Sequence, residues 1–315
     1  MSEVCFSVLH YKDDSKTTCC VDSLLRLHEN RTCKVRICIC DNASKNDSVK
    51  RLRRRYAQCA RVHFIESEEN VGFAKGNNLG FSYIKNNFNA DAAVFLNNDT
   101  EIVDEDFAIK LLKTFTDNEA DVISVDVYDP FLNQHQSPLC LFEEMQKMIE
   151  DEVARAQITS KVKGKQKAFY IARKEIKKCA YKLPPLRPKV VAALQKALPS
   201  ATHYNELVRD VVCQGSCVCV GKHFIQTMPF VFYPETFMYF EECILSVLCH
   251  RNNMNTIHVP NLQVLHHHGT FSKENMRKDT VDAEVRQARS LLDSYEILSD
   301  LTEHPQKAVF VSTAE

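Results

Sequence analysis

Short apolar runs alternate with amphipathic segments through the first part of the chain. Each apolar run is long enough for a buried strand but too short for a helix. Between the runs, apolar residues recur every three or four positions, which is the spacing of one face of an α-helix. The pattern predicts strands at residues 4–9, 35–40, 62–65, 92–96 and 122–125.

Strands that alternate with helices predict βαβ units, right-handed crossovers and a largely parallel sheet. In sheets of this kind, ligands bind beyond the carboxyl ends of the strands. Polar residues stand at or just beyond three of the predicted strand ends, namely Asp41, Asn70 and Asp99. The sequence therefore predicts an α/β domain in which these residues surround a ligand site.

The alternation stops near residue 131 and returns at residue 211. The intervening stretch is polar and helical in pattern, and residues 161–189 hold eleven Lys or Arg against one acid, Glu175. Apolar positions at helical spacing then mark a helix near the end of the chain. We divide the chain into residues 1–130, a basic helical insertion at 131–210, a second half at 211–272 and a helical segment at 273–315.

Composition and charge narrow the functional classes. A formal net charge of -1 gives no reason to expect a nucleic-acid partner. The first residues lack the pattern of a signal peptide, and charges interrupt every apolar run before the ~18 residues of a membrane helix. The fourteen cysteines include no CxxC pair, which indicates reduced thiols in a cytoplasmic protein.

The basic segment at residues 161–189 has two interpretations. It is either a solvated helical hairpin, which we favour slightly, or a surface that rests on an anionic membrane. The second interpretation would place the protein peripherally on the inner face of the membrane, close to a lipid-linked substrate.

The fourth predicted strand ends in Asn97, Asn98 and Asp99, which gives it an oxygen-rich tip. A carboxylate with neighbouring amide oxygens suits a hard cation such as Mg²⁺ or Mn²⁺, and that cation would in turn bind a diphosphate. An Asx turn that caps the following helix explains the same residues equally well.

The segment from Asn70 to Gly80 is rich in glycine and amides. Gly72 permits a tight turn, while Lys75 and Asn78 bring a cation and an amide to a helix N-terminus, where anions bind well. Packing of the helix on the sheet would explain the glycines without any ligand.

Asp41, Asn42 and Ser44 follow the second predicted strand. Their side chains either hydrogen-bond a nucleobase or ribose, or form a turn. The local sequence does not separate these two hypotheses.

Two further groups are candidates for chemistry. Glu241 and Glu242 follow an aromatic run, and apolar surroundings raise the pKa of a carboxyl group toward that of a general base. Surface acids at the start of a helix are the more common explanation. His266 begins a run of three histidines at a strand end, which is either a solvated turn or a source of a ligand for a metal or a phosphate.

Taken in order, these segments resemble the bacterial family-2 glycosyltransferases of GT-A fold, in particular capsular-polysaccharide and rhamnosyltransferase-like members. The resemblance covers about residues 4–127 and 211–298. In the first half it rests on a DNxSxDxS-like turn at 41–48, a glycine- and asparagine-rich signature at 70–80 and a DxD-type position at 96–100. In the second half it rests on a small-residue turn at 214–217, an aromatic segment with two acids at 237–245 and a closing V-P…V-x-H…S pattern at 259–272.

The resemblance implies a mechanism. Asp99 and His266 would hold Mn²⁺ or Mg²⁺ on the diphosphate of a nucleotide sugar, and Glu242 would be the base that deprotonates the acceptor hydroxyl. Direct attack by that hydroxyl would invert the anomeric centre. Residues 1–130 would bind the donor, and residues 211–272 would bind a glycan or lipid-linked glycan acceptor. The implied donor-binding residues are Asp41, Asn42, Ser44, Asn70, Lys75, Asn78, Asn97 and Asn98, and those on the acceptor side are Gly215, Ser216 and Glu241.

The sequence departs from the family pattern at Asn97, where the first metal-motif acid is expected, and at Ile244, where a second acid is frequent. The first departure lowers the expected metal affinity. Two other functions compete with the transferase. One is a non-catalytic nucleotide-sugar-binding subunit of a glycan-assembly complex, and the other is a nucleotidyltransferase, although the loop after the first strand lacks the glycines usual for that class.

Overall fold

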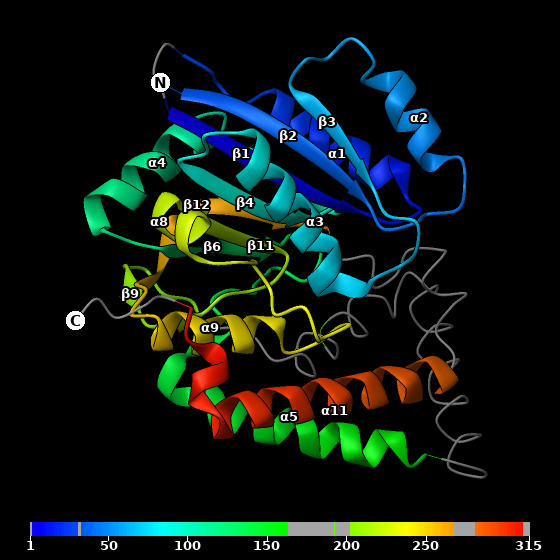
Figure 1. Ribbon diagram of the computed structural model, residues 1–315, viewed down its shortest axis with the longest axis vertical. Coiled ribbons are helices and arrows are strands. Elements are labelled where there is room, and N and C mark those ends of the chain that lie inside the picture. The colour runs from blue at the N-terminus through cyan, green and yellow to red at the C-terminus, as the bar shows by residue number, and fades with distance from the viewer. Residues whose placement is uncertain (1, 31–32, 163–191, 193–201, 268–280, 311–315) are drawn as a thin grey trace.

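The computed structural model describes residues 2–30, 33–162, 192, 202–267 and 281–310. One large sheet forms its centre, with strand order β3-β2-β1-β4-β11-β6-β12-β5 (Figure 1). Strands β1 to β4 are parallel, and β11 is antiparallel to both of its neighbours. The strands are β1 (Ser2–His10), β2 (Cys33–Asp41), β3 (Val62–Glu66), β4 (Ala92–Asn97), β5 (Thr100–Glu101), β6 (Val122–Asp129), β11 (Cys217–Gly221) and β12 (Thr256–His266).

Alternate side chains of the strands supply two cores, one on each face of the sheet. On β1, Val4, Phe6 and Val8 pack with α1 (Asp14–Leu25), α2 (Ser48–Arg55) and α4 (Phe107–Asn118). Cys5 points into the other core, which α3 (Gly72–Asn87), α8 (Lys222–Thr227) and α9 (Glu241–Arg251) cover. The predicted α/β fold with a mostly parallel sheet is therefore confirmed.

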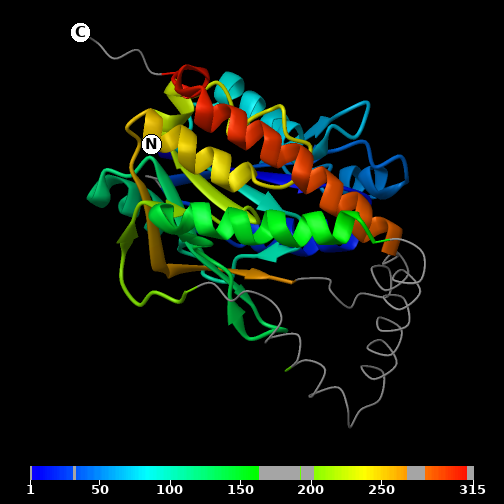
Figure 2. The same cartoon turned by 90° about the horizontal axis from the view of Figure 1, so that it is seen from below.

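Two long helices add a further layer to the second face. Helices α5 (Met145–Ser160) and α11 (Val281–Glu303) pack against each other and lie below α9 in Figure 1. Figure 2 shows the same two helices, green and orange-red, from below. Short strands precede and follow α5 in the chain, so the stretch around it is not helical throughout. These are β7 (Gln134–His135), β8 (Cys140–Leu141), β9 (Val208–Arg209) and β10 (Val211–Val212).

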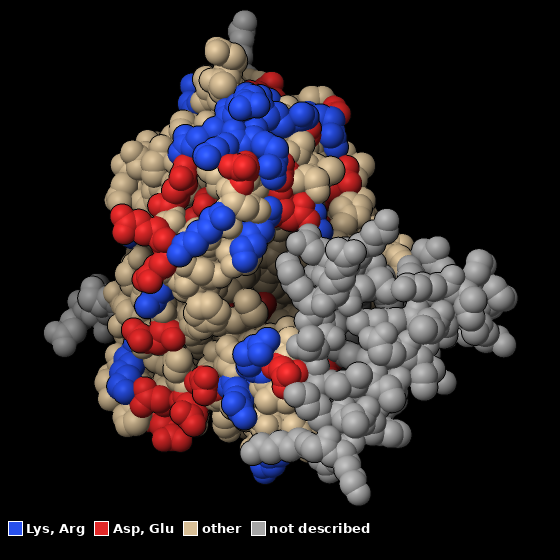
Figure 3. All heavy atoms as spheres, turned by 90° about the vertical axis from the view of Figure 1, so that its right-hand side faces the viewer, with Lys and Arg blue, Asp and Glu red and all other residues tan. Residues whose placement is uncertain are grey.

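Helix α2 carries a cluster of basic side chains on the described part of the surface. Arg53, Arg54 and Arg55 are exposed there, and Figure 3 shows Lys and Arg gathered at the top of one face. Arg53 pairs with Glu66 and Arg55 with Asp22, so much of this charge is neutralised.

Most of the basic segment 161–189 lies outside the described residues, so its two interpretations stay predictions, as does the division into four segments. Among the described residues, no helix is both long enough and apolar enough to cross a bilayer.

Candidate active site

Three candidate residues end strands at one edge of the sheet. Asp41 is the last residue of β2, Asn97 of β4 and His266 of β12. Because β11 is antiparallel to both β4 and β6, and β12 is parallel to β6, the strands β4 and β12 point in the same direction. Their carboxyl ends therefore meet at the edge where ligands bind in such sheets.

Asp99 lies in the turn between β4 and β5 and faces the side chains of Lys16 and His266. Its Oδ1 is 3.3 Å from Nε2 of His266, and its Oδ2 accepts a hydrogen bond from Nζ of Lys16 at 3.1 Å. Burial alone would raise the pKa of Asp99, but His266 and Lys16 outweigh it and hold that pKa well below its usual range. The side chain is therefore an ionised carboxylate held between Lys16 and His266, and it does not cap the following helix.

The Asp99–His266 pair has donor atoms that fit a divalent cation. Pairing of Thr100 on β5 with His266 on β12 keeps the two side chains together. Nδ1 of His266 lies 2.8 Å from Oε1 of Gln136, a contact of the kind that orients metal-binding imidazoles. One carboxylate and one imidazole suit Mn²⁺ better than Mg²⁺, which prefers oxygen ligands. Such a cation would compete with Lys16 for the carboxylate.

Asp41, Asn42 and Ser44 hold the local backbone. Asp41 accepts hydrogen bonds from the backbone N–H and hydroxyl of Ser44. Asn42 donates to the carbonyl of Gly72 at 2.9 Å and accepts from the N–H of Val71 at 2.9 Å. The turn hypothesis thus describes these side chains in the structure, and Asn42 joins the end of β2 to the start of α3.

The segment from Asn70 to Gly80 likewise serves packing. Asn78 accepts from the N–H groups of Val231 and Phe232 and donates to the Phe232 carbonyl at 2.6 Å. Gly72 has φ +84, and a Cβ there would lie 2.4 Å from the carbonyl oxygen of Phe237. Asn70 and Lys75 are exposed, and Asn70 accepts a hydrogen bond from the N–H of Gly72.

The two asparagines before Asp99 point to different places. The amide of Asn98 donates to the hydroxyl of Thr17 at 3.0 Å and is thereby bound to α1. Asn97 instead lines a cavity of about 660 Å³ that His266 also lines. Of these two, only Asn97 is positioned to meet a ligand in that cavity.

The cavity joins this edge of the sheet to the two acids at the start of α9. Its walls come from the ends of β4 and β12, the turn before β11, the segment around β7, helix α5 and the loop before α9. Gly215, Ser216, Glu241 and Glu242 all line it, together with Glu152 and Arg155 of α5. The structure therefore brings the predicted acceptor-side residues into one space with Asn97 and His266.

A strained loop presents the two acids to the cavity. Tyr239 and Phe240 have φ values of 83° and 61°, a region that non-glycine residues seldom occupy. Such strain is common at functional sites. A Cβ at Gly215 would lie 2.1 Å from Oε1 of Glu242, so glycine is needed there for the carboxyl group to fit.

The pKa values of both acids are raised. For Glu241, burial and the charge of Glu242 raise the pKa to about 8, and its Oε1 has no hydrogen-bond partner in the described part of the chain. For Glu242, burial raises the pKa, and the charge of Glu152 adds to the effect, while the backbone N–H of Gly215 opposes it. Because the charge of Glu242 is one of the causes that raise the pKa of Glu241, we assign the proton of the pair to Glu241 and the negative charge to Glu242.

Sequence patterns did not identify Lys16, Gln136, Glu152 or Arg155 as site residues. Lys16 lies in the first turn of α1, where a lysine is not unusual in sequence, and only the fold brings it to Asp99. Glu152 and Arg155 are three apart on α5 and so share one face of that helix, but nothing local shows that this face borders a cavity.

Comparison with known proteins gives a family match and a set of structural neighbours. Residues 11–178, more than half of the chain, match the model of the family described as Glycosyl transferase family 2. A comparison with curated protein sequences finds no match.

The structural neighbours share the fold at low sequence identity. Residues 1–349 of TarS from S. aureus align with a TM-score of 0.52 and 10% identity, over 90% of this chain and 65% of that one. GalNAc-T7, solved with UDP, GalNAc and Mn²⁺, aligns with a TM-score of 0.52 and 12% identity, over 85% of this chain and 44% of that one. The chain spans less than two thirds of the length of either neighbour. The structural likeness, together with the family match, confirms the expected GT-A fold.

Proposed function

Because this chain belongs to glycosyl transferase family 2, we propose that it transfers a sugar from a nucleotide-diphosphate sugar to a hydroxyl group of a glycan. One observation carries the proposal: the cavity that His266 and Asn97 line also holds the carboxyl group of Glu242. A group suited to the donor and a group suited to deprotonating the acceptor therefore face the same space.

The donor end of the proposed site is centred on Asp99 and His266. These two residues would hold a divalent cation, and that cation would neutralise negative charge on the diphosphate leaving group. Lys16 pairs with the same carboxylate, so a bound cation would displace its ammonium group from Asp99. Among the asparagines at this strand end, Asn97 is the proposed contact to the donor, because it lines the cavity.

Asp41, Asn42, Ser44 and Asn78 have a positioning role in this proposal. Their side chains hold the backbone around which the nucleotide would bind, since they are hydrogen-bonded within the protein. The exposed Asn70 and Lys75 remain candidates for direct contact with the nucleotide.

Glu242 is the proposed base. Its raised pKa brings it closer to the working range of a general base, and Gly215 gives its carboxyl group room beside the cavity. The acceptor hydroxyl would lose its proton to Glu242 and attack the anomeric carbon directly, which inverts the configuration. Gly215, Ser216 and Glu241 form the neighbouring acceptor wall.

The size of the cavity supports a saccharide acceptor. Ligand cavities commonly measure about 300–1,000 Å³, and this one lies within that range. Its lining combines apolar side chains with polar groups such as Arg155 and Gln214, which could hydrogen-bond the hydroxyl groups of a sugar. We propose a surface polysaccharide, such as a capsule or O-antigen chain, or a lipid-linked glycan as the acceptor.

A binding screen tests the proposal. We expect at least one nucleoside diphosphate or nucleotide sugar to raise the melting temperature, and Mn²⁺ to enlarge the shift. Asp99→Asn should remove the effect of Mn²⁺. Asp104→Asn is the matched control, because Asp104 also pairs with a lysine, at 2.6 Å from Nζ of Lys110, but on the exposed surface. If no nucleotide shifts the wild-type protein, the donor-site assignment is wrong.

A further inference from the structure

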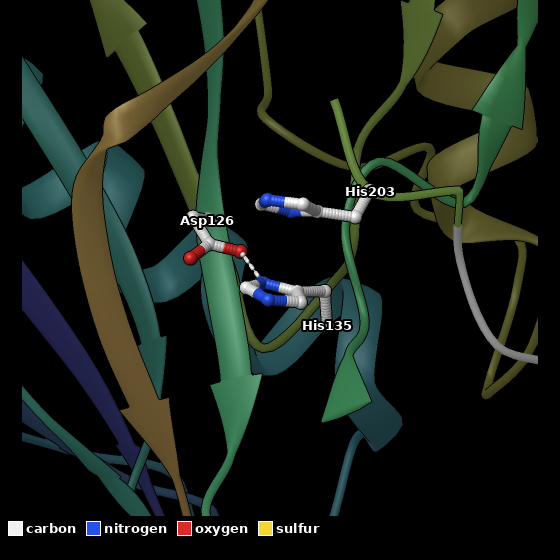
Figure 4. Close-up of side chains that lie close together, drawn as sticks. All are labelled: Asp126, His135 and His203. Carbon is white, nitrogen blue, oxygen red and sulfur yellow. Dashed lines mark hydrogen bonds and ion pairs between the residues drawn. The ribbon is translucent and has the colours of Figure 1, made fainter. Parts of the chain in front are cut away.

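A second cluster of potential metal ligands lies beside the cavity and apart from Asp99. Asp126 of β6, His135 of β7 and His203 each offer one ligand atom, and these atoms all lie within 4.8 Å of one another. Figure 4 shows both imidazole rings directed toward the Asp126 carboxylate. Two imidazoles and a carboxylate form a set that zinc and similar divalent transition metals favour over Mg²⁺.

The carboxylate at the centre of the cluster is held in place. Asp126 is 2% exposed, and its Oδ1 lies 2.7 Å from Nδ1 of His135. Its Oδ2 accepts a hydrogen bond from the side-chain amide of Gln263 at 2.8 Å. The irregularity in β12 between Val259 and Gln263 brings Gln263 opposite Asp126. This outer contact orients the carboxylate as such contacts do at metal sites.

The two imidazoles stack on each other, with ring centroids 3.8 Å apart and planes inclined by 26°. Two protonated rings at this distance would repel each other, whereas two neutral rings can share a cation. A tetrahedral zinc ion keeps its ligand atoms roughly 3.3 Å apart. The two rings would therefore have to turn out of their stacked arrangement, so that the lone pair of each ring points at the metal.

A third imidazole provides an independent observation. His258 is fully buried, and the one hydrogen-bond contact of its ring within the described residues is with the backbone of Ser124. It pairs with Ser124 in the parallel register of β12 and β6, so it shares a sheet face with Asp126, two residues further along β6. The ring of Tyr204, the neighbour of His203, lies 6.2 Å from the ring of His258. A buried imidazole with at most one backbone contact among the described residues adds a further nitrogen ligand type next to the cluster.

We propose that Asp126, His135 and His203 bind one zinc-like divalent cation that fastens the segment before β9 to the sheet. The site is separate from the proposed donor site and does not depend on the proposed function. It borders the active-site cavity, because His135 lines that cavity and the adjacent Gln136 contacts His266. A bound metal would therefore also fix the support of His266.

Metal titration of the chelator-treated full chain tests this site. We expect one equivalent of Zn²⁺ to bind and to raise the melting temperature, and Co²⁺ to give the visible absorption of a tetrahedral complex. His203→Ala should weaken zinc binding more than tenfold. His203 is exposed, so this variant should fold, and its metal-free melting temperature should match that of the wild type.

Two control variants distinguish this site from another histidine–carboxylate pair and from the donor site. His223→Ala removes an imidazole that also lies 2.7 Å from a carboxylate, that of Asp121, but this pair belongs to no metal-ligand cluster found among the described residues. Asp99→Asn removes the donor-site carboxylate. Both variants should bind zinc as the wild type does. The proposal is overturned if the wild type binds no zinc, or if His203→Ala binds it with unchanged affinity.

Discussion

The asparagines beside β2 and in α3 differ from the acids around the cavity in how fully their side chains are hydrogen-bonded within the protein. Asn42 and Asn78 use both ends of their amides on backbone groups of the protein. By contrast, Glu241 keeps an oxygen without a hydrogen-bond partner within the described residues, and Glu242 faces the cavity. The first region is satisfied internally, while the second leaves polar groups for something else to meet.

The difference separates residues that stabilise the fold from residues available for catalysis, although both groups belong to the motifs of one family. A buried polar group that is fully paired adds modest stability, and an unpaired one costs about 1–3 kcal/mol. A chain retains such a cost where a ligand or a proton later provides the partner. Substitutions in the two regions should therefore affect different quantities: stability in the first and turnover in the second.

The largest effect is expected for Glu242→Gln. The amide cannot accept the acceptor proton, so the transfer rate should fall by about 10²–10⁴-fold. Donor affinity and melting temperature should change little, because the amide fills the same space beside Gly215. Initial rates of sugar transfer, together with nucleotide titration, measure both quantities.

Glu235→Gln provides the control for that prediction. Glu235 is an exposed acid in the same loop, so its removal changes the net charge equally without changing the cavity lining. The control should keep its rate. Turnover that persists in Glu242→Gln would rule out Glu242 as the base. The cavity acids would then have no catalytic role that distinguishes them from the asparagines that stabilise the fold.

Asn78→Ala should cause the next largest effect, a loss of about 2–4 kcal/mol in the free energy of unfolding. The substitution leaves two N–H groups and a carbonyl of residues 231–232 without their partner. Asn87→Ala on the same helix is the control, because its amide makes one exposed bond to the Tyr83 carbonyl and should contribute within about 0.5 kcal/mol. Urea unfolding of both variants measures the difference, and equal losses would contradict the architectural role of Asn78.

The sequence predicts the fold well because its information is local and periodic. Short apolar runs separated by amphipathic segments predict β1 to β4 and β6, and the carboxyl-edge rule directs attention to Asp41, Asn70 and Asp99. The orientation of individual amides is not periodic. Whether Asn42 faces a ligand or the backbone of Gly72 depends on where α3 begins, which the pattern leaves open.

Contacts between distant segments are the part that sequence patterns could not predict. The pairing of Lys16 with Asp99 needs α1 and the β4–β5 turn to meet, and the Asp126–His135–His203 cluster needs three separate segments to meet. The irregularity in β12 that aligns Gln263 with Asp126 has no local signature beyond Pro260. Such features depend on packing geometry, so the structure is required to find them.

Glu241→Gln offers the smallest of these effects and the most direct test of the unpaired region. The folded-state pKa of Glu241 is about 8, well above the value of 4.5 for an unperturbed glutamate. Between these pH values, the folded protein keeps a proton that the unfolded chain has released, so stability falls as pH rises through this window. Removal of the carboxyl group should abolish the loss and stabilise the protein by about 2 kcal/mol at pH 8, but hardly at pH 4.5.

The pH dependence is the decisive part of that measurement. A purely steric effect of the amide would shift the unfolding free energy equally at every pH, whereas the electrostatic effect must grow from pH 4.5 to pH 8. Glu143→Gln changes the same charge at an exposed position and should show no such growth. If Glu241→Gln gave a difference independent of pH, Glu241 would be ionised in the folded protein at neutral pH. Glu241 would then be as competent a base as Glu242, and the assignment of the proton within the pair would have to be reversed.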